Sequence, residues 1–217
     1  ESDPERAQRD NAEAVAHLRA AADAVAAHLV QISTDYVFSG DLDRPYREDD
    51  PTGPQSVYGR SKLAGELAAG PNAAVVRTSW VCGEHGGNMV KTVLRLLDAG
   101  VPELGFVADQ RGNPTFTADL AVAVRELAAE RATGVFHVTN AATGDDGAPG
   151  VSWYEFVREI VAAAGGDPAI VRPITTAELQ PPRPAPRPAN SVLATTRRPP
   201  LRDYREPLAD LIARLRG

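Results

Sequence analysis

The chain has 217 residues, 43% of them hydrophobic and 24% charged, which is the composition of an ordinary soluble globular protein with a sizeable core. Its net charge of −6 argues against a general binder of nucleic acid or of anionic membranes. The single cysteine excludes an internal disulfide and a cysteine-based zinc cage, and no apolar run approaches the roughly 20 residues that a membrane span requires. A reducing cytoplasm is therefore the expected location, and no metal site is predicted.

The first part of the chain alternates helical and strand patterns. Asp3 is a plausible N-cap and Pro4 suits the first helical position of the opening segment. In chain order we predict a helix at 3–27, a strand at 28–33, a loop at 40–56, a helix at 57–70 and a strand at 73–80. Helices and short buried strands at this spacing are typical of a parallel, doubly wound α/β sheet. The carboxylates at 41–50 are expected to lie in a solvated loop.

Beyond residue 80 the pattern is less regular. Helices are expected at 88–99, 117–131, 152–164 and 206–216, and a strand at 134–139. Ser152 is the predicted N-cap of the third of these helices. The stretch 180–188 must be extended, because its prolines block both a helix and a central strand.

Three polar residues, Ser33, Thr34 and Asp35, come at the end of the first predicted strand. Hydroxyl and carboxylate groups at the carboxyl end of a buried parallel strand lie where open α/β sheets bind ligands. The same groups can also cap the following loop through local hydrogen bonds. Taken alone, the stretch favours the capping interpretation.

Tyr58 and Lys62 stand four residues apart on a predicted helix, so their side chains share one face. An ammonium group beside a phenol favours the phenolate and lowers the tyrosine pKa from about 10 towards neutrality, where the group can pass a proton. The pair alone is weak evidence, because an exposed helical pair arises easily by chance. The choice of lysine strengthens it, since the chain has only two lysines among 23 basic residues, and arginine is not chemically interchangeable with lysine.

Several motifs in one order point to a family. The stretches STDYVF (33–38), YGRSKLAGE (58–66) and VVRTSW (75–80) are followed by DQRGNPTF, GVFHVTN, SWYEF and RPANS. Together they resemble the extended short-chain dehydrogenase/reductases, and within them the reductases of dTDP-rhamnose synthesis. The resemblance implies a Rossmann-type sheet and reduction of the C4 keto group of dTDP-4-dehydro-L-rhamnose with NADPH or NADH.

The resemblance also implies site residues. Thr34 would hydrogen-bond the substrate carbonyl, Tyr58 would donate the proton, and Lys62 would hold the nicotinamide ribose and lower the tyrosine pKa. Cofactor contacts are implied for Ser33, Tyr58, Lys62, Arg77, Thr78 and Ser79, the last three through their backbone. Substrate contacts are implied for Thr34, Asp35, Trp80, Arg187 and Asn190. Core filling is the alternative for Trp80. For Arg187 the alternatives are a solvated arginine or a polyproline segment that binds a partner domain.

We divide the chain on the same basis into a partial dinucleotide-binding domain (1–80 and 117–140) and an interleaved substrate-binding lobe (81–116 and 141–217). The Gly-rich turn that cradles a cofactor pyrophosphate does not occur in residues 1–30, so residues 1–217 alone are expected to be inactive. The glycines at 144–150 match such a turn literally. Two aspartates and a proline make that stretch unsuitable for a pyrophosphate, and a surface loop is expected instead.

Two other functions stay open at this point. Sugar-nucleotide dehydratases resemble the pattern but carry a glutamate where this chain has Tyr36, so an elimination would lack its acid–base residue. A non-catalytic regulatory subunit, like that of methionine adenosyltransferase, would share the fold and act as a binding partner. A nucleotide sugar is the expected small-molecule partner, and the resemblance also allows a homodimer.

Overall fold

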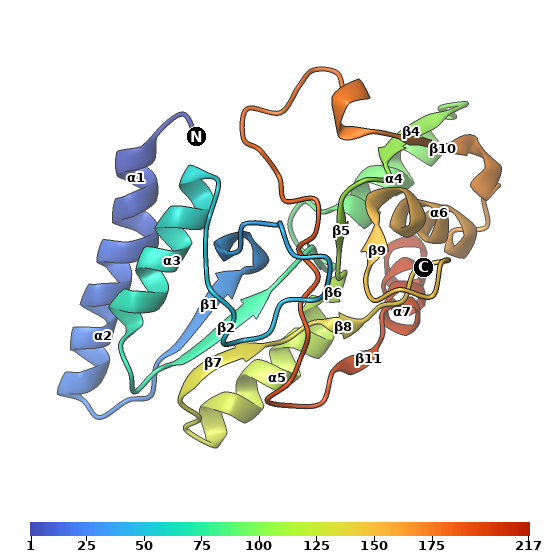
Figure 1. Cartoon of the computed structure of the whole chain (residues 1–217). Helices are drawn as coiled ribbons and strands as arrows, with labels where there is room; N and C mark the ends of the chain where they lie inside the picture. Colours follow the sequence, from blue (N-terminus) through green and yellow to red (C-terminus); the bar gives the residue numbers. More distant parts are fainter.

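Three parallel strands form the sheet that positions the candidate site. In the computed structural model, which describes residues 1–217, β1 (Val30–Thr34), β2 (Ala74–Thr78) and β7 (Gly134–His137) lie side by side in that order (Figure 1). The predicted α/β fold with a parallel sheet is confirmed. Each predicted strand is displaced or shortened by one or two residues, which is the usual uncertainty of an element boundary.

Helices cover both faces of this sheet. One face carries α1 (Pro4–Gln8), η1 (Arg9–Glu13), α2 (Ala14–Ala24) and α3 (Val57–Ala69), and the other carries α5 (Thr117–Ala129) (Figure 1). Successive strand residues point to opposite faces. Val75 accordingly packs in an apolar cluster with Val15 and Ala69, whereas Val76 packs with Leu120 and other residues on the side of α5. The sheet is thus buried on both sides.

The first helical segment is interrupted where it meets α3. Residues Arg9–Glu13 form a π-helical turn between the two α-helical pieces, so the uninterrupted helix predicted at 3–27 is wrong in this detail. Asn11 lies within the turn and its side-chain amide donates to the Ser61 hydroxyl at 3.1 Å. Single π-helical turns of this kind accommodate an extra residue at a contact that a regular helix would miss.

The second part of the molecule holds the largest apolar cluster. It is built by α4 (Met89–Asp98), β4 (Leu104–Val107), α6 (Trp153–Ala163), β10 (Val171–Ile174) and α7 (Arg205–Arg216). Sixteen buried residues form this cluster, and Ser152 caps α6 with a capping box that includes Glu155, as predicted for the cap. The parallel pair β4–β10 was not predicted, because each strand has only four residues and they lie far apart in sequence.

Short elements complete the chain. They are η2 (Asp35–Val37), β3 (Val81–Cys82), β5 (Arg111–Gly112), β6 (Thr115–Phe116), β8 (Asn140–Ala141), β9 (Val151–Ser152), η3 (Pro168–Ile170), η4 (Thr176–Glu178) and β11 (Leu201–Asp203). Between η4 and β11 the chain runs across the middle of the molecule without regular structure, as its prolines predict (Figure 1). None of the helices combines the length and the apolar character needed to cross a lipid bilayer.

One carboxylate of the acidic loop is buried rather than solvated. Glu48 is 5% exposed, and its Oε2 accepts from the Thr196 hydroxyl at 2.5 Å while Oε1 accepts from the backbone amides of Thr196 and His137. Burial raises the pKa of Glu48, but these hydrogen bonds outweigh burial, so the net change is a lowered pKa. The expectation of a wholly solvated loop is wrong at this position. Glu48 joins the loop to the end of β7 and to residues 179–200, the irregular stretch between η4 and β11 that is called the late segment below.

Candidate active site

The polar residues at the end of β1 are held in place by local hydrogen bonds. Thr34 accepts from the Tyr36 amide at 3.2 Å and thereby caps the short helix η2, while its hydroxyl donates to Asp35 Oδ1 at 2.9 Å. The capping role expected for this stretch is therefore present. It leaves Asp35 Oδ2 without a hydrogen-bond partner, although the residue is only 2% exposed.

Burial gives Asp35 an unusual proton affinity. Removal from water raises its pKa to about 6, although the neighbouring hydroxyls of Ser191 and Thr34 oppose the rise. The carboxyl can therefore take up or release a proton close to neutral pH. A second orphaned group lies on the adjacent strand, where the buried Thr78 hydroxyl, opposite Thr34 in register, also has no partner.

Tyr58 lies in the first turn of α3, two residues after its N-cap Ser56. Its ring packs edge-on against the ring of Tyr36, with centroids 6.1 Å apart, and 45% of the residue is exposed. α3 can approach η2 this closely because residue 59 is glycine. A Cβ at Gly59 would lie 2.2 Å from the Tyr36 carbonyl oxygen.

The structure corrects the expected effect of Lys62 on Tyr58. Burial raises the pKa of Tyr58, the Thr34 hydroxyl opposes the rise, and the charge of Asp35 adds to it. Lys62 is not among the groups that shift this pKa, and its Nζ donates to the Ile32 carbonyl at 2.6 Å. Helical spacing placed the two side chains on one face, but it could not determine where the lysine head group points.

The predicted cofactor residues at the ends of β1 and β2 are mostly buried and bonded. Ser33 donates to Glu66, Arg77 forms an ion pair with the same carboxylate, and the Ser79 hydroxyl donates to the Asn113 carbonyl at 2.7 Å. The side chains of Ser33, Arg77 and Ser79 are thus used within the protein. Only the backbone of these residues and the unpartnered hydroxyl of Thr78 are left to contact a cofactor, and these contacts stay predictions.

Trp80 follows β2 with a left-handed backbone conformation, at φ 46°. Its ring stacks on Trp153 with centroids 3.6 Å apart and an angle of 12° between the planes. Gly112 lies directly behind it, and a Cβ there would come within 2.6 Å of the indole ring. A non-glycine residue rarely adopts this conformation, and such strain gathers at functional sites. Trp80 also packs against the large apolar cluster. The predicted substrate contact and the alternative of core filling therefore both stay open for this residue.

Arg187 lines a cavity of about 70 Å³ together with Arg183, Trp153, Phe106 and other residues. The two guanidinium groups also act on the pKa of Tyr36, which burial raises and their positive charges lower. Tyr36 in turn touches Tyr58, so the late segment and the end of β1 belong to one region. An arginine pair beside aromatic and apolar side chains suits an aromatic ring that carries phosphate groups.

The Asn190 side chain is hydrogen-bonded within the protein. Its side-chain amide donates to the carbonyl oxygens of Leu42 at 2.8 Å and Arg44 at 3.0 Å, and its Oδ1 accepts from the Val192 amide. These contacts join the late segment to the acidic loop. Its predicted contact with substrate stays a prediction.

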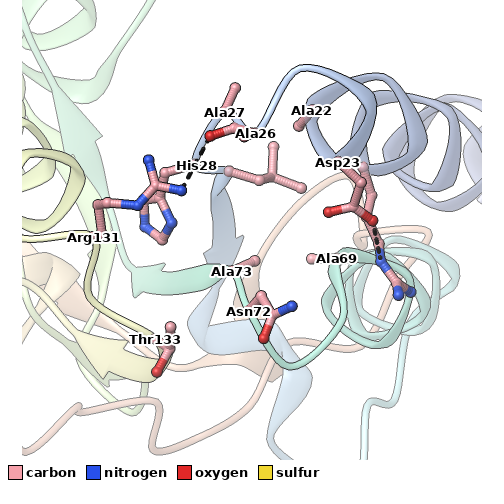
Figure 2. A pocket seen from close by; sticks show the side chains of 12 residues that line it. Ala22, Asp23, Ala26, Ala27, His28, Ala69, Asn72, Ala73, Arg131 and Thr133 are labelled. Carbon is pink, nitrogen blue, oxygen red and sulfur yellow. Dashed lines mark hydrogen bonds and ion pairs between the residues drawn. The ribbon is translucent and has the colours of Figure 1, made fainter.

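A larger pocket, of about 260 Å³, lies at the other end of the sheet (Figure 2). It is lined by Leu29, which precedes β1, whereas Thr34 ends that strand. Its arginines are already bonded, since Arg19 pairs with Asp23 and Arg131 donates to the Ala26 carbonyl. These contacts explain the pocket's polar lining without a ligand.

Sequence reasoning missed three residues of the site: Glu66, Arg183 and Trp153. Each stood within or beside a motif that was recognised. Glu66 lies four residues after Lys62, which places it on the same face of α3, and that spacing could have indicated it. No local signal in the sequence could have paired Trp153 with Trp80, because 73 positions separate them.

The chain is similar to known proteins over most of its length. The model of the family described as RmlD substrate binding domain matches residues 1–216. A dTDP-4-dehydrorhamnose reductase from Mycolicibacterium smegmatis is 44% identical over 228 residues, an alignment that covers 100% of this chain and 67% of that relative.

Two solved structures are similar over most of the chain. A dTDP-4-dehydrorhamnose reductase from Clostridium acetobutylicum has a TM-score of 0.89 and 39% identity, covering 100% of this chain and 76% of the other. The enzyme of that name from Bacillus anthracis, in complex with NADP, has a TM-score of 0.84 and 35% identity, covering 94% and 72%.

Proposed function

We propose that this chain, which belongs to the dTDP-4-dehydrorhamnose reductase family, carries the proton donor and substrate groups of an oxidoreductase that reduces the C4 keto group of dTDP-4-dehydro-L-rhamnose. One observation carries the proposal. Tyr58 lies beside Thr34 at the carboxyl end of a parallel strand, with Lys62 one helical turn away on the same face. The regulatory-subunit alternative has no such support, because the named relatives are reductases.

Tyr58 is the proton donor. Its raised pKa keeps the phenol protonated at neutral pH, which is the state that an acid catalyst needs before it gives up its proton. Thr34 donates a hydrogen bond to the substrate carbonyl when it turns from Asp35. As negative charge develops on that oxygen, both hydroxyl groups stabilise it.

A nicotinamide cofactor supplies the hydride when it is bound, and the B. anthracis relative was crystallised with NADP. Lys62 and the Thr78 hydroxyl fit such a group, since both are polar, lie at the same end of the sheet, and Thr78 has no partner of its own. Lys62 would hold the ribose of such a cofactor, and the backbone of residues 77–79 would contact its nicotinamide. NADPH and NADH both suit these contacts.

The substrate occupies the region between β1 and the late segment. Asp35 offers a free buried oxygen to a sugar hydroxyl, and Trp80 provides a flat apolar surface for the sugar ring. Arg187 and Arg183 bind the diphosphate, since guanidinium groups match phosphate geometry. We also propose a cytoplasmic location, the division into two interleaved domains, and a homodimer.

The test measures NADPH oxidation by the full protein, with dTDP-4-dehydro-L-rhamnose as substrate. Tyr58→Phe should lower kcat by about 10²–10⁴-fold and leave NADPH affinity nearly unchanged, because only the acidic proton is lost. Tyr154→Phe, at a half-buried tyrosine that packs against Arg158, is the matched control and should keep full turnover. Near-normal kcat in Tyr58→Phe would remove this tyrosine from the mechanism.

A further inference from the structure

One face of α3 contacts the end of β1 in register. Tyr58, Lys62 and Glu66 are spaced by four residues and form a stripe along the helix. Lys62 Nζ donates to the Ile32 carbonyl at 2.6 Å, and Glu66 Oε1 accepts from the Ser33 hydroxyl at 2.5 Å. Two neighbouring turns of the helix therefore hold two consecutive residues of the strand, and Tyr58, one turn before Lys62, lies beside the next strand residue, the proposed catalytic Thr34.

Glu66 is also half of a buried ion pair with β2. Arg77 donates to it through Nε at 2.9 Å and Nη2 at 2.7 Å, and both side chains are 5% exposed. Arg77 lies opposite Ser33 in the parallel register, so one carboxylate covers neighbouring positions on two strands. Apolar side chains of equal volume often stabilise a core as well as a buried ion pair does. The pair therefore contributes a fixed geometry between helix and sheet.

Neighbouring groups hold the Arg77 side chain in this arrangement. Its Nη1 donates to the Glu48 carbonyl at 3.3 Å, and its guanidinium lies 4.9 Å from the centre of the Phe38 ring. Because Glu48 is bonded to Thr196, the ion pair is continuous with the late segment that reaches the substrate region.

We propose that Glu66 is a positioning residue, which fixes the helix that carries Tyr58 and Lys62 against the end of β1. This inference rests on the proposed function, because only a reaction at Thr34 makes this distance matter to turnover. Without the negative charge, Arg77 loses its ion-pair partner and Lys62 loses the anion one turn away that favours its charged form. The helix can then shift relative to the strand.

A double-mutant cycle in the full protein separates positioning from general support of the fold. Glu66→Gln keeps the shape and removes the charge, and it should lower kcat by about tenfold, since displacements of about 1 Å at an active site cost up to about 10²-fold. KM for the nucleotide sugar should change by less than about twofold, because the substrate contacts lie elsewhere. In a Lys62→Met background the same substitution should change kcat by less than about twofold, since residues that act as a unit are not additive.

Two further variants keep the test independent of folding defects. Glu66→Gln leaves Arg77 buried without a partner, so the double variant Glu66→Gln/Arg77→Met removes both charges and should fold while it keeps the loss of kcat. Glu103→Gln is the matched control. It breaks an ion pair of 2.6 Å with Arg172 whose side chains are 63% and 54% exposed, and it should turn over like the wild type.

Hydrogen–deuterium exchange gives a readout that does not need turnover. In the Glu66→Gln/Arg77→Met variant, amides of residues 57–62 should exchange at least about tenfold faster than in the wild type, whereas those of residues 171–174 should be unchanged. Normal exchange and normal kcat in that variant overturn the inference, and so does a loss of kcat that is equal in the Lys62→Met background. If the wild type shows no reductase turnover, the proposed function fails instead, and exchange at 57–62 alone decides the positioning role.

Discussion

Replacement of Asp35 by asparagine should stabilise the protein above pH 6. The folded chain holds this carboxyl fully buried, with one oxygen unpartnered, and burial raises its pKa from 3.8 to about 6. Each pKa unit corresponds to about 1.4 kcal/mol, so a rise of about two units means that ionised Asp35 costs the folded state about 3 kcal/mol. Asparagine has the same shape, still accepts from Thr34, and carries no charge.

The sign of the pH dependence follows from the raised pKa. Below about pH 3 the carboxyl is protonated in both folded and unfolded chains, and the penalty is absent. Between pH 4 and pH 6 the unfolded chain releases its proton first, so stability falls as pH rises. Above pH 6 the penalty is constant. The stability gained by Asp35→Asn should therefore be close to zero at pH 4 and reach about 3 kcal/mol at pH 7.5.

Urea unfolding followed by far-UV circular dichroism at several pH values measures this difference. Asp41→Asn, at an exposed carboxylate of the neighbouring loop, is the control and should show no pH-dependent gain. A gain that is the same at pH 4 and pH 7.5, or a loss of stability at pH 7.5, would refute the reasoning. The Asp35→Asn variant should also reduce the nucleotide sugar more slowly, because a buried polar group at an active site can lower stability and still be needed for activity.

Two further predictions concern residues next to the site. Gly112→Ala should lower kcat/KM for the nucleotide sugar, because its Cβ would come within 2.6 Å of the Trp80 ring and break the stack with Trp153; Gly87→Ala, whose Cβ would meet open space and which, like Gly112, has no left-handed backbone conformation, is the control. Burial lowers the pKa of His137 to about 4, so its contribution to stability falls by about 3 kcal/mol as pH drops from 6.5 to 4, and the Asp35→Asn variant, which lacks the opposing aspartate, should show this loss. Adding His137→Asn to Asp35→Asn should flatten that acid limb in urea titrations, and an unchanged slope would contradict the assignment.

These two titrations explain why the Asp35 effect must be measured as a difference. Between pH 4 and pH 6 the buried aspartate makes stability fall as pH rises, while the buried histidine makes it rise. The two contributions have similar size and opposite sign, so the wild type alone should show a flat profile in this range. Each single variant removes one of the two opposing effects and reveals the other.

Local patterns were sufficient for the elements that carry the site. The spacing of Tyr58 and Lys62, the polar residues after β1 and the cap at Ser152 depend on neighbours within one or two helical turns. Periodicity and capping report on that range directly. The parallel sheet followed from the alternation of such elements, which is why the fold class could be predicted without a structure.

Long-range contacts were beyond the same reasoning. Glu48 belongs to a stretch of acidic and turn-forming residues, so only its contact with Thr196, 148 positions away, shows that it is buried. The strands β4 and β10 are too short to be distinguished from loop before they pair. The head group of Lys62 could reach either the phenol or the Ile32 carbonyl, and sequence spacing does not choose between two partners at similar range.

The three consecutive polar residues at the junction of β1 and η2 have three different roles in the proposed function. Ser33 points toward α3 and bonds to Glu66, so it holds the catalytic helix at a fixed register. Thr34 caps the following turn and places its hydroxyl beside Tyr58. Asp35 keeps a free buried oxygen for the substrate, at a cost in stability that its raised pKa measures. A shift of one residue between strand and helix would exchange these roles, because successive side chains point to opposite faces. The contacts of Lys62 and Glu66 with consecutive strand residues oppose that shift, which is why disturbing Glu66 should reach the chemistry through Lys62.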